Sequence, residues 1–245
     1  MSQLTLSSID SSLVEEISSK RNEPDWLKEY RKNSLSIYHD LPAEVSPLYN
    51  KYTDARRMNP EQVSLSTSSD SSVPDFLTKR LDEIKNEISI VQIGSNIYSI
   101  NVNDELKSKG LVISSLDDAL QSHSELIQKT LEDSNSKEDK YTALNNAAFN
   151  SGIFVYIPQN LTVDKPIHLV SCLSLDGIST ISRNMIIAEK NTQVSVVQEL
   201  YAPKASKQQA YLELLDTRVG ENSKLDFTTL QIMDQSTVNF STRRT

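Results

Sequence analysis

The sequence is poor in the residues that most often carry chemistry or punctuate a chain. It contains one cysteine, three histidines and five glycines in 245 residues. The single cysteine, Cys172, excludes an internal disulfide and an all-cysteine metal site on one chain. No run approaches the roughly 18 apolar residues that a membrane-spanning helix needs. The N-terminus lacks a basic segment followed by an apolar one, so we expect no secretory signal and a cytoplasmic protein.

Charge and motif content disfavour further classes of function. Lys and Arg number 25 against 33 Asp and Glu, so the formal net charge is −8. An acidic surface repels phosphate backbones, and general nucleic-acid binding is therefore disfavoured. The P-loop pattern GxxxxGK(S/T), the dinucleotide pattern GxGxxG and the zinc-protease pattern HExxH are all absent. We expect neither a nucleic acid nor a membrane as a partner.

The hydrophobic period changes near Gly152 and divides the chain. Before this point apolar residues recur at helical spacing. A serine-rich stretch in this half predicts a flexible loop, because such a polar run cannot bury enough surface to order itself. We expect an N-terminal helical segment at 1–60, the loop at 61–75, an α/β region at 76–151 and an all-β region at 152–245.

Local signals predict several elements in the first half. Leu13, Val14 and Ile17 share one face of a short helix, and residues 76–88 form another. Residues 90–102 predict two strands joined by a hairpin turn at 94–96. Further helices are expected over 116–131, capped by Ser115, and over 141–150, terminated by Gly152.

From Ile153 onward the helical period disappears. Seven short β-branched runs follow one another at 153–157, 165–173, 184–188, 193–200, 210–219, 224–233 and 237–241. No helical pattern separates these runs, so the second half is predicted to be all β.

A repeat of 31 residues organises this β half. Asn160, Asn191 and Asn222 are spaced at this interval, and each follows a strand-like run and precedes an apolar residue that restarts the next strand. Asn tolerates the left-handed backbone conformation that a sharp corner requires. A fixed period of this length with short strands and no helices favours a parallel β-helix, a solenoid of stacked coils. The alternative is three unrelated Asn turns in an ordinary β-sandwich.

The candidate chemical residues do not form a recognisable set. His39, His123 and His168 are far apart and show no ligand spacing. His168 and Cys172 would share one strand face about 13 Å apart, too far for one metal ion. Cys172 lies in an apolar run, where a small buried hydrophobe is expected.

The acidic residues of the strands likewise show no cluster in the sequence, although stacking could bring distant ones together. They are Asp164, Asp176, Glu189, Glu199, Glu213 and Glu221. We therefore assign no catalytic, cofactor-binding or metal-ligating residue, and we expect a scaffold and not an enzyme.

One long motif carries a family resemblance. The segment 141–167, YTALNNAAFNSGIFVYIPQNLTVDKPI, closely resembles the SufB/SufD family of the SUF iron–sulfur cluster assembly machinery. Further matching segments are Glu23-Pro24-Asp25-Trp26 with Arg31, then 183–189, Ala202-Pro203 and Leu230-Gln231. The resemblance covers nearly the whole chain and is weakest between about residues 40 and 75.

The resemblance implies a fold, a function and partners. It implies an α+β protein in which a helical N-terminal domain precedes a right-handed parallel β-helix, in agreement with the repeat. Family members pair through their β-helices, so the implied partner is a SufB-like or an identical subunit. They bind the SufC-type ATPase through a helical C-terminal segment, and the complex builds nascent iron–sulfur clusters. No cofactor is expected on this chain itself.

Two departures from the family pattern refine this expectation. SufB-type proteins have a cysteine just before the segment that matches Tyr201-Ala202-Pro203, and this chain has Leu200 there. Later residues linked to cluster formation, a cysteine in SufB-type and a histidine in SufD-type proteins, have no counterpart before Thr245. We therefore expect a SufD-like, C-terminally truncated chain and assign no cluster ligand.

Two other functions remain open from the sequence. One is a carbohydrate-active parallel β-helix enzyme, which requires two carboxylates roughly 5–9.5 Å apart in a groove. The other is a homodimeric interaction protein unrelated to iron–sulfur assembly.

Overall fold

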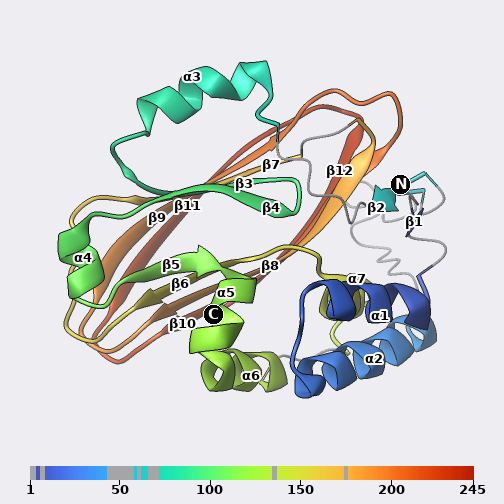
Figure 1. Ribbon diagram of the computed structural model, residues 1–245, viewed down its shortest axis with the longest axis horizontal. Helices are drawn as coiled ribbons and strands as arrows, with labels where there is room; N and C mark the ends of the chain where they lie inside the picture. The colour runs from blue at the N-terminus through green and yellow to red at the C-terminus, as the bar shows by residue number, and fades with distance from the viewer. Residues whose placement is uncertain are drawn as a thin grey trace, which may run out of the picture.

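The computed structural model describes residues 4–5, 9–42, 58–59, 62–65, 72–133, 137–173 and 176–245. The architecture is mixed α+β: two β-sheets face each other, and helices lie on their outer sides (Figure 1). None of the helices in these ranges combines the length and the apolar character of a membrane-spanning segment.

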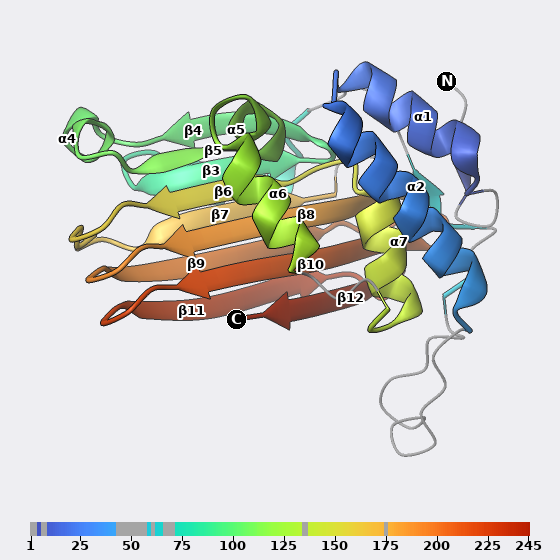
Figure 2. The ribbon, with the colours of Figure 1, turned by 90° about the horizontal axis from the view of Figure 1, so that it is seen from below.

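Three helices pack together beside the sheets. They are α1 (Ser11–Lys20), α2 (Asp25–Asp40) and α7 (Lys140–Ala148) (Figure 2). The predicted apolar face of α1 is confirmed, because Leu13, Val14 and Ile17 are all buried. Asp10 caps this helix by accepting the backbone N–H of Ser12 at 2.9 Å.

A buried ion pair attaches the α1–α2 turn to the end of α7. Arg31 Nε and Nη2 donate to the two carboxylate oxygens of Glu23 at 2.8 and 2.6 Å. Arg31 Nη1 also donates to the carbonyl oxygen of Ala147, and its guanidinium lies 3.7 Å from the ring centroid of Phe149. Both charged side chains are fully buried, so each depends on these contacts to offset the loss of water.

The region after the serine-rich stretch forms a helix and a hairpin. Helix α3 (Asp75–Glu83) is followed by β3 (Ile88–Ile93) and β4 (Asn96–Asn101), which pair antiparallel. Gly94, with φ of 59°, makes the predicted hairpin turn. The predicted extension of the helix to Ile88 is wrong. Ile88 starts β3, where it is buried and pairs in parallel with Ile167.

The predicted helix over 116–131 is divided in two. It follows α4 (Asp104–Ser108) and the short strand β5 (Val112–Ser115), and it consists of α5 (Leu116–Ser122) and α6 (Ser124–Glu132). Ser115 caps α5 as expected, accepting the Asp118 backbone N–H at 3.0 Å. The break falls at His123, whose φ of −132° is not helical and whose ring lies 5.2 Å from that of Phe154.

Gly152 does not end a helix, contrary to our expectation. Helix α7 ends at Ala148, and Phe149 is its C-cap. A Cβ at Gly152 would lie 2.1 Å from the carbonyl oxygen of Arg183. The glycine is therefore required by the close approach of two backbones.

The seven predicted strands are confirmed. They are β6 (Ile153–Ile157), β7 (Ile167–Cys172), β8 (Ile178–Ala188), β9 (Gln193–Ala202), β10 (Gln209–Val219), β11 (Lys224–Met233) and β12 (Thr237–Arg244). No helix interrupts the described residues after α7.

Successive strands alternate between the two sheets, and each pairs in parallel with the strand two places later. Strands β6, β8, β10 and β12 lie in one sheet, and β7, β9 and β11 lie in the other. The chain thus crosses back and forth while the strands stack one above another (Figure 2). Strands β5 and β4 add antiparallel partners to the first and second sheet, beside β6 and β3.

The three asparagines of the repeat line up one above another, as predicted. Asn160, Asn191 and Asn222 have φ values of 65°, 59° and 57°. Asn191 Nδ2 donates to Asn160 Oδ1 at 2.9 Å, and Asn222 Nδ2 donates to Asn191 Oδ1 at 3.0 Å. The corners therefore recur at one edge of the stack and do not belong to unrelated turns.

Apolar side chains from both sheets fill the space between them. Ile90, Leu169, Ile186, Val196 and Leu215 come from five different strands and are all buried. A second cluster lies on the outer face of the first sheet, under the helices. One apolar cluster thus holds the two sheets together, and the other holds the helices to the first sheet.

Part of the predicted serine-rich loop is ordered by the core. Ser64–Leu65 forms β2, which pairs with β1 (Leu4–Thr5) and runs parallel to β8. Apolar side chains explain why this short segment is a strand and not a loop. Val63 and Leu65 are buried in the cluster between the helices and the first sheet. Residue 61 and residues 66–71 of the predicted loop lie outside the described residues.

Candidate functional site

The chemistry-bearing residues that the sequence suggested are dispersed. His39 is in the last turn of α2, His123 lies between α5 and α6, and His168 is on β7. Among the residues that the structure describes, no group of three or more His, Cys, Asp or Glu could hold a metal ion. A candidate site must therefore be built from smaller groupings on the strands.

Cys172 is a buried residue of the apolar layer under α3. Its side chain belongs to a cluster with Val91, Val170 and Leu77, and its Sγ donates to the carbonyl oxygen of Leu173 at 3.2 Å. Burial raises the pKa of the Cys172 thiol to about 12. The thiol is therefore not a nucleophile at neutral pH in this arrangement.

A polar cluster around Glu199 lies on the same outer face, beside this apolar layer. Glu199 sits on β9 and is 1% exposed. Arg80 on α3 donates through Nε and Nη2 to its two carboxylate oxygens at 2.9 and 2.7 Å. Tyr201 donates its hydroxyl to Oε2 at 2.7 Å, and His168 Nδ1 lies 3.2 Å from Oε1.

These partners keep Glu199 ionised. Burial alone raises the pKa of a carboxyl, but hydrogen bonds from Arg80, Tyr201 and His168 together hold the pKa of Glu199 below its usual range. Burial and the adjacent carboxylate in turn raise the pKa of Tyr201. The cluster clamps α3 to the sheet, and its carboxylate oxygens are already occupied by donors.

A second polar grouping lies between the two sheets. Glu213 on β10 accepts hydrogen bonds at Oε1 from Asn184 Nδ2 on β8, at 2.7 Å, and from Gln198 Nε2 on β9. Thr229 Oγ1 on β11 donates to Gln198 Oε1 at 3.2 Å, and Ser241 Oγ on β12 lies 3.3 Å from Glu213 Oε2. We call these five residues, Asn184, Gln198, Glu213, Thr229 and Ser241, the inter-sheet network.

The inter-sheet network links five successive strands. Burial raises the pKa of Glu213 despite the hydrogen bonds from Asn184 and Gln198. The network contains amides, hydroxyls and one carboxyl but no thiol or histidine. Its chemistry is hydrogen bonding between the two sheets, and this limits sliding of one strand past the next.

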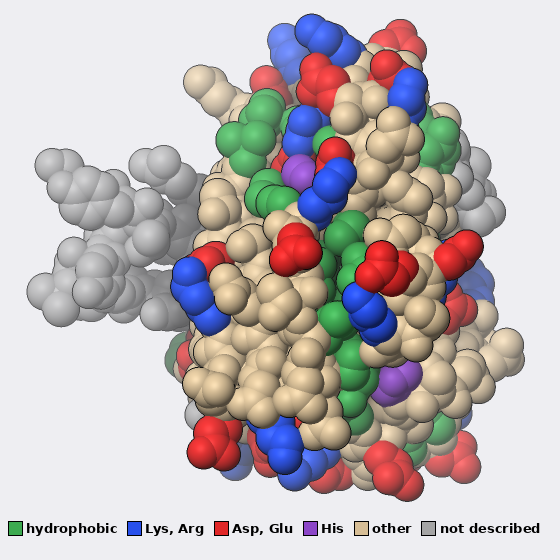
Figure 3. All heavy atoms as spheres, turned by 90° about the vertical axis from the view of Figure 1, so that its left-hand side faces the viewer, with side chains coloured by type: hydrophobic (Ala, Val, Ile, Leu, Met, Phe, Trp, Pro, Cys, Tyr) green, Lys and Arg blue, Asp and Glu red, His purple; other side chains and the backbone are tan. Residues whose placement is uncertain are grey.

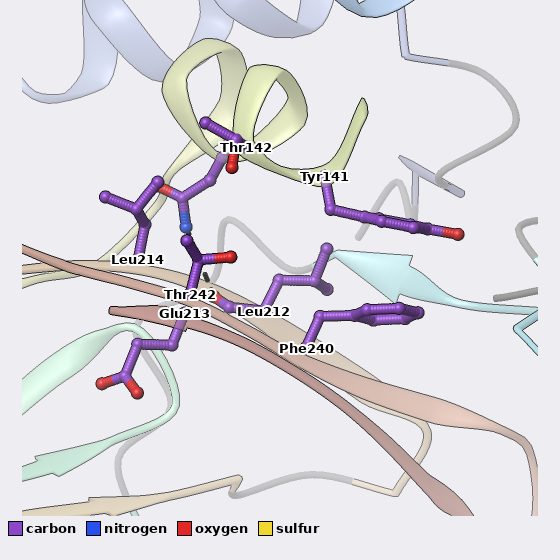
Figure 4. Close-up of a pocket in the computed structure, with 8 residues that line it drawn as sticks. Tyr141, Thr142, Leu212, Glu213, Leu214, Phe240 and Thr242 are labelled. Carbon is purple, nitrogen blue, oxygen red and sulfur yellow. Dashed lines mark hydrogen bonds between the residues drawn. The ribbon is translucent and has the colours of Figure 1, made fainter. Parts of the chain in front are cut away.

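The outer side of β10 faces α7. Tyr141 on α7 stacks on Phe240 of β12 with ring centroids 4.0 Å apart, and a cavity of about 10 Å³ lies beside this pair. Asn145 lines the cavity, and its Oδ1 is buried with no hydrogen-bond partner among the residues that the structure describes. A space of this size holds about one water molecule. Figure 4 shows the Glu213 side chain pointing away from α7, to the opposite side of the strand from Leu212 and Leu214.

The strand acids do not come together as a catalytic pair. Glu199 and Glu213 are the most buried of them, and they lie on opposite faces of the strands: Glu199 faces α3, whereas Glu213 faces the inter-sheet space. The sequence did not single out Arg80 or Gln198, and Asn184 was noted only as part of the matching segment 183–189. Polar residues inside an alternating strand pattern are the only signal that could have indicated the inter-sheet network.

The surface where α4 and the Asn turns lie carries both signs of charge. Figure 3 shows Lys and Arg interspersed with Asp and Glu over this face, with hydrophobic side chains gathered in a narrow strip between them. This face does not present the one-signed basic surface that nucleic-acid binding uses.

Comparison with known proteins gives matches over most of this architecture, from the end of α1 onward. A family model described as the SufBD protein N-terminal region matches residues 20–169. A second, described as the SUF system FeS cluster assembly SufBD core domain, matches residues 172–245. The boundary between the two models falls within the β half, after β7 has begun.

Individual relatives show the same match. An iron–sulfur cluster assembly SufBD family protein of Staphylococcus aureus (strain USA300) is 26% identical over 250 residues. A protein of the same description from Staphylococcus saprophyticus is 25% identical over 250 residues. Each alignment covers 95% of this chain and 52% of the relative, so the chain spans about half the length of the curated relatives it matches.

Proposed function

The chain belongs to the SufBD family, and from this we propose that it is a SufD-like scaffold subunit of the SUF iron–sulfur cluster assembly complex. It pairs with a SufB-type partner in the cytoplasm and cooperates with a SufC-type ATPase. It is not an enzyme. The iron–sulfur cluster is the cargo of the complex, and we assign no residue of this chain as its ligand.

The stacked strands are the observation that carries this proposal. We propose that they form a right-handed parallel β-helix over residues 152–245, preceded by the helical segment at 1–60, the serine-rich segment at 61–75 and the α/β region at 76–151. The parallel pairing of every second strand and the asparagine ladder support this description. Such a stack is stiff, because each strand is hydrogen-bonded to its neighbours, and stiffness suits a docking platform.

The position of Leu200 supports the SufD-like role. SufB-type proteins resemble this chain here but have a cysteine at the corresponding place. Leu200 is buried between the sheets with Leu173, Ala202 and Tyr211. An apolar side chain in an apolar cluster offers no ligand to iron or sulfur, so this chain organises a partner and does not hold the cluster at this position.

The two other functions considered from the sequence are less well supported. A carbohydrate-active β-helix enzyme needs a pair of carboxylates facing one groove. Glu199 and Glu213 face opposite sides, and each is tied to hydrogen-bond donors. A homodimeric interaction protein unrelated to iron–sulfur assembly is disfavoured by the match to the SufBD core domain.

Co-expression tests the proposal directly. We expect this chain to co-elute in gel filtration with a SufB-type protein from the same cell, and a SufC-type ATPase to join the complex. Each protein run alone serves as the control for its elution volume. Elution of this chain apart from the SufB-type protein in the three-component mixture would contradict the proposal.

A further inference from the structure

A polar cavity of about 240 Å³ lies between helix α5, the start of β4 and the end of α1. Asp117 and Asp118 of α5 line it on one side, and Arg21 at the end of α1 and Asn96 at the start of β4 line it on others. The segment Ser151-Gly152, which leads into β6, completes the lining. The cavity therefore lies outside strands β6–β12 and belongs to none of the groupings described above.

Hydrogen bonds to the backbone hold the lining of this cavity in place. Arg21 Nη1 donates to the carbonyl oxygen of Phe149 at 2.9 Å, and Arg21 Nε donates to Asp117 Oδ1 at 2.8 Å. The backbone N–H of Leu116 donates to the carbonyl oxygen of Gly152 at 2.9 Å, which ties the start of α5 to that segment. The cavity is therefore formed before any ligand binds, and a pre-formed site loses little conformational entropy on binding.

Asn96 supplies a hydrogen-bond donor that has no acceptor. Its Nδ2 is buried and makes no hydrogen bond among the residues that the structure describes. A buried donor left unpaired costs about 1–3 kcal/mol. Because the Asn96 side chain lines the cavity, a ligand that presents an oxygen to Nδ2 removes this cost.

The cavity carries one unbalanced negative charge. Arg21 and Asp117 form an ion pair and offset each other. Asp118 has no cationic partner in the described part of the chain: its Oδ2 accepts the Ser115 hydroxyl at 2.7 Å, and its Oδ1 accepts no hydrogen bond there. Asp118 is exposed whereas Asn96 Nδ2 is buried, so the free charge lies toward solvent and the free donor lies deeper. The site thus favours a cation that also carries a hydrogen-bond acceptor.

We propose that this cavity binds a small amino alcohol, a molecule with an ammonium group and a hydroxyl group a few bonds apart. The ammonium donates to Asp118 Oδ1, and the hydroxyl oxygen accepts from Asn96 Nδ2. A metal ion does not meet both requirements, because neither the ion nor the water bound to it accepts a hydrogen bond from Asn96. The volume is below the roughly 300–1,000 Å³ of sites for drug-sized ligands, so the ligand has few heavy atoms.

Binding is weak, because the charged contact is made at an exposed carboxylate. Water and salt screen an ion pair at such a position, and the buried hydrogen bond to Asn96 adds selectivity for the hydroxyl. The site goes beyond the proposed function, since it takes a small molecule and requires no partner protein.

Titrations with three small compounds, followed by ¹H–¹⁵N NMR at constant pH and ionic strength, test the two contacts separately. Ethanolamine carries both groups, propylamine lacks the hydroxyl, and ethylene glycol lacks the charge. We expect ethanolamine to shift the side-chain amide signal of Asn96 to saturation with a Kd of about 1–10 mM. Propylamine should bind at least about threefold more weakly, and ethylene glycol should not bind. Equal responses to all three compounds, or a response to magnesium chloride in place of ethanolamine, overturn the proposal.

Substitutions at Asp118 and Asn96, followed at the backbone amide of residue 118, test the assigned residues. Asp118→Asn removes the charge but keeps an oxygen for the Ser115 hydroxyl, and it should weaken ethanolamine binding at least about tenfold. Asp104→Asn is the matched control, because Asp104 is fully exposed on α4 and its substitution changes the net charge equally. It should bind ethanolamine like the unmodified chain, whereas Asn96→Ala should bind ethanolamine and propylamine alike.

Unchanged ethanolamine affinity in Asp118→Asn, or a retained preference for ethanolamine in Asn96→Ala, contradicts the assignment. The three compounds are compared on the unmodified chain, so that comparison holds whichever variants fold. Neither experiment requires a SufB-type protein, so this proposal and the proposed function fail independently of each other.

Discussion

The Nδ2 atom of Asn191 donates to Oδ1 of Asn160 across 2.9 Å, although the two residues are 31 positions apart in the sequence. Both residues have a left-handed backbone conformation. Each therefore serves as a corner of the chain and as a step in a ladder of amides. Asn222 extends the ladder by the same contact to Asn191. The repeat in the sequence is thus a repeat in hydrogen bonding as well as in backbone shape.

The ladder predicts which of two substitutions at Asn191 destabilises the fold more. Asn191→Ala loses the side-chain hydrogen bonds and places an alanine at a φ of 59°, whereas Asn191→Gly loses only the hydrogen bonds. A left-handed backbone costs a residue with a Cβ about 1–2 kcal/mol. We expect the alanine variant to be less stable than the glycine variant by about 1 kcal/mol in urea unfolding. Equal losses would show that backbone conformation does not explain the recurrence of Asn.

Adding a single methyl group at Gly152 should greatly reduce the stability of the fold. The Cβ of Gly152→Ala would stand 2.1 Å from the backbone oxygen of Arg183, so strands must move apart. We expect the free energy of unfolding to fall by about 3 kcal/mol or more. Gly110→Ala is the control, because its Cβ would meet Pro158 only at 3.4 Å and the cost is that of its positive φ, about 1–2 kcal/mol. A milder effect at Gly152 than at Gly110 would contradict this packing.

The ionised Glu199 side chain should stabilise the fold at neutral pH, and this contribution should be lost in acid. Its folded-state pKa is lowered below the ordinary value of 4.5, so its contribution is fully present above about pH 4.5 and is lost as the pH falls through the folded pKa. Glu199→Gln should lower the free energy of unfolding by about 1–3 kcal/mol at pH 7, because Arg80 loses a charged acceptor. The difference between the two chains should shrink in urea titrations below pH 4.5. A constant difference would argue against an ionised Glu199.

Glu213 should have the opposite effect on the stability of the fold at neutral pH. The pKa of Glu213 in the folded state is raised above 4.5. Ionising this carboxylate therefore destabilises the fold, and the loss grows as the pH rises from about 4.5 through the folded-state pKa. Glu213→Gln keeps an oxygen to accept from Asn184 and Gln198, and it should be more stable than the unmodified chain by about 0.5–2 kcal/mol at pH 7. The gain should vanish near pH 4. A loss of stability at pH 7 would show that the charge is needed by its surroundings.

Periodicity made much of the β half predictable. Each of the seven apolar runs became a strand, because a buried strand needs little more than β-branched residues between turn signals. The Asn spacing indicated which corners stack, since a left-handed corner restricts the residue type. The first half was harder to predict. The break at His123, the strand β5 and the end of α3 before Ile88 depend on packing against residues far along the chain.

The polar groupings could not be predicted from the sequence. Arg80 and Glu199 are 119 positions apart, and nothing local to either indicates the other. The separation of Glu199 from Glu213 also depends on which strand face points inward, and strand alternation alone does not decide this. Only the crossing of successive strands between two sheets places one carboxylate under α3 and the other in the inter-sheet network.

Hydrogen–deuterium exchange in the presence and absence of a SufB-type protein tests most directly whether the strand stack is the docking platform. The account predicts that binding slows exchange of backbone amides within β6–β12, while exchange in α1 and α2 stays unchanged. Slower exchange confined to α1 and α2, with the strands unaffected by saturating partner, would contradict it.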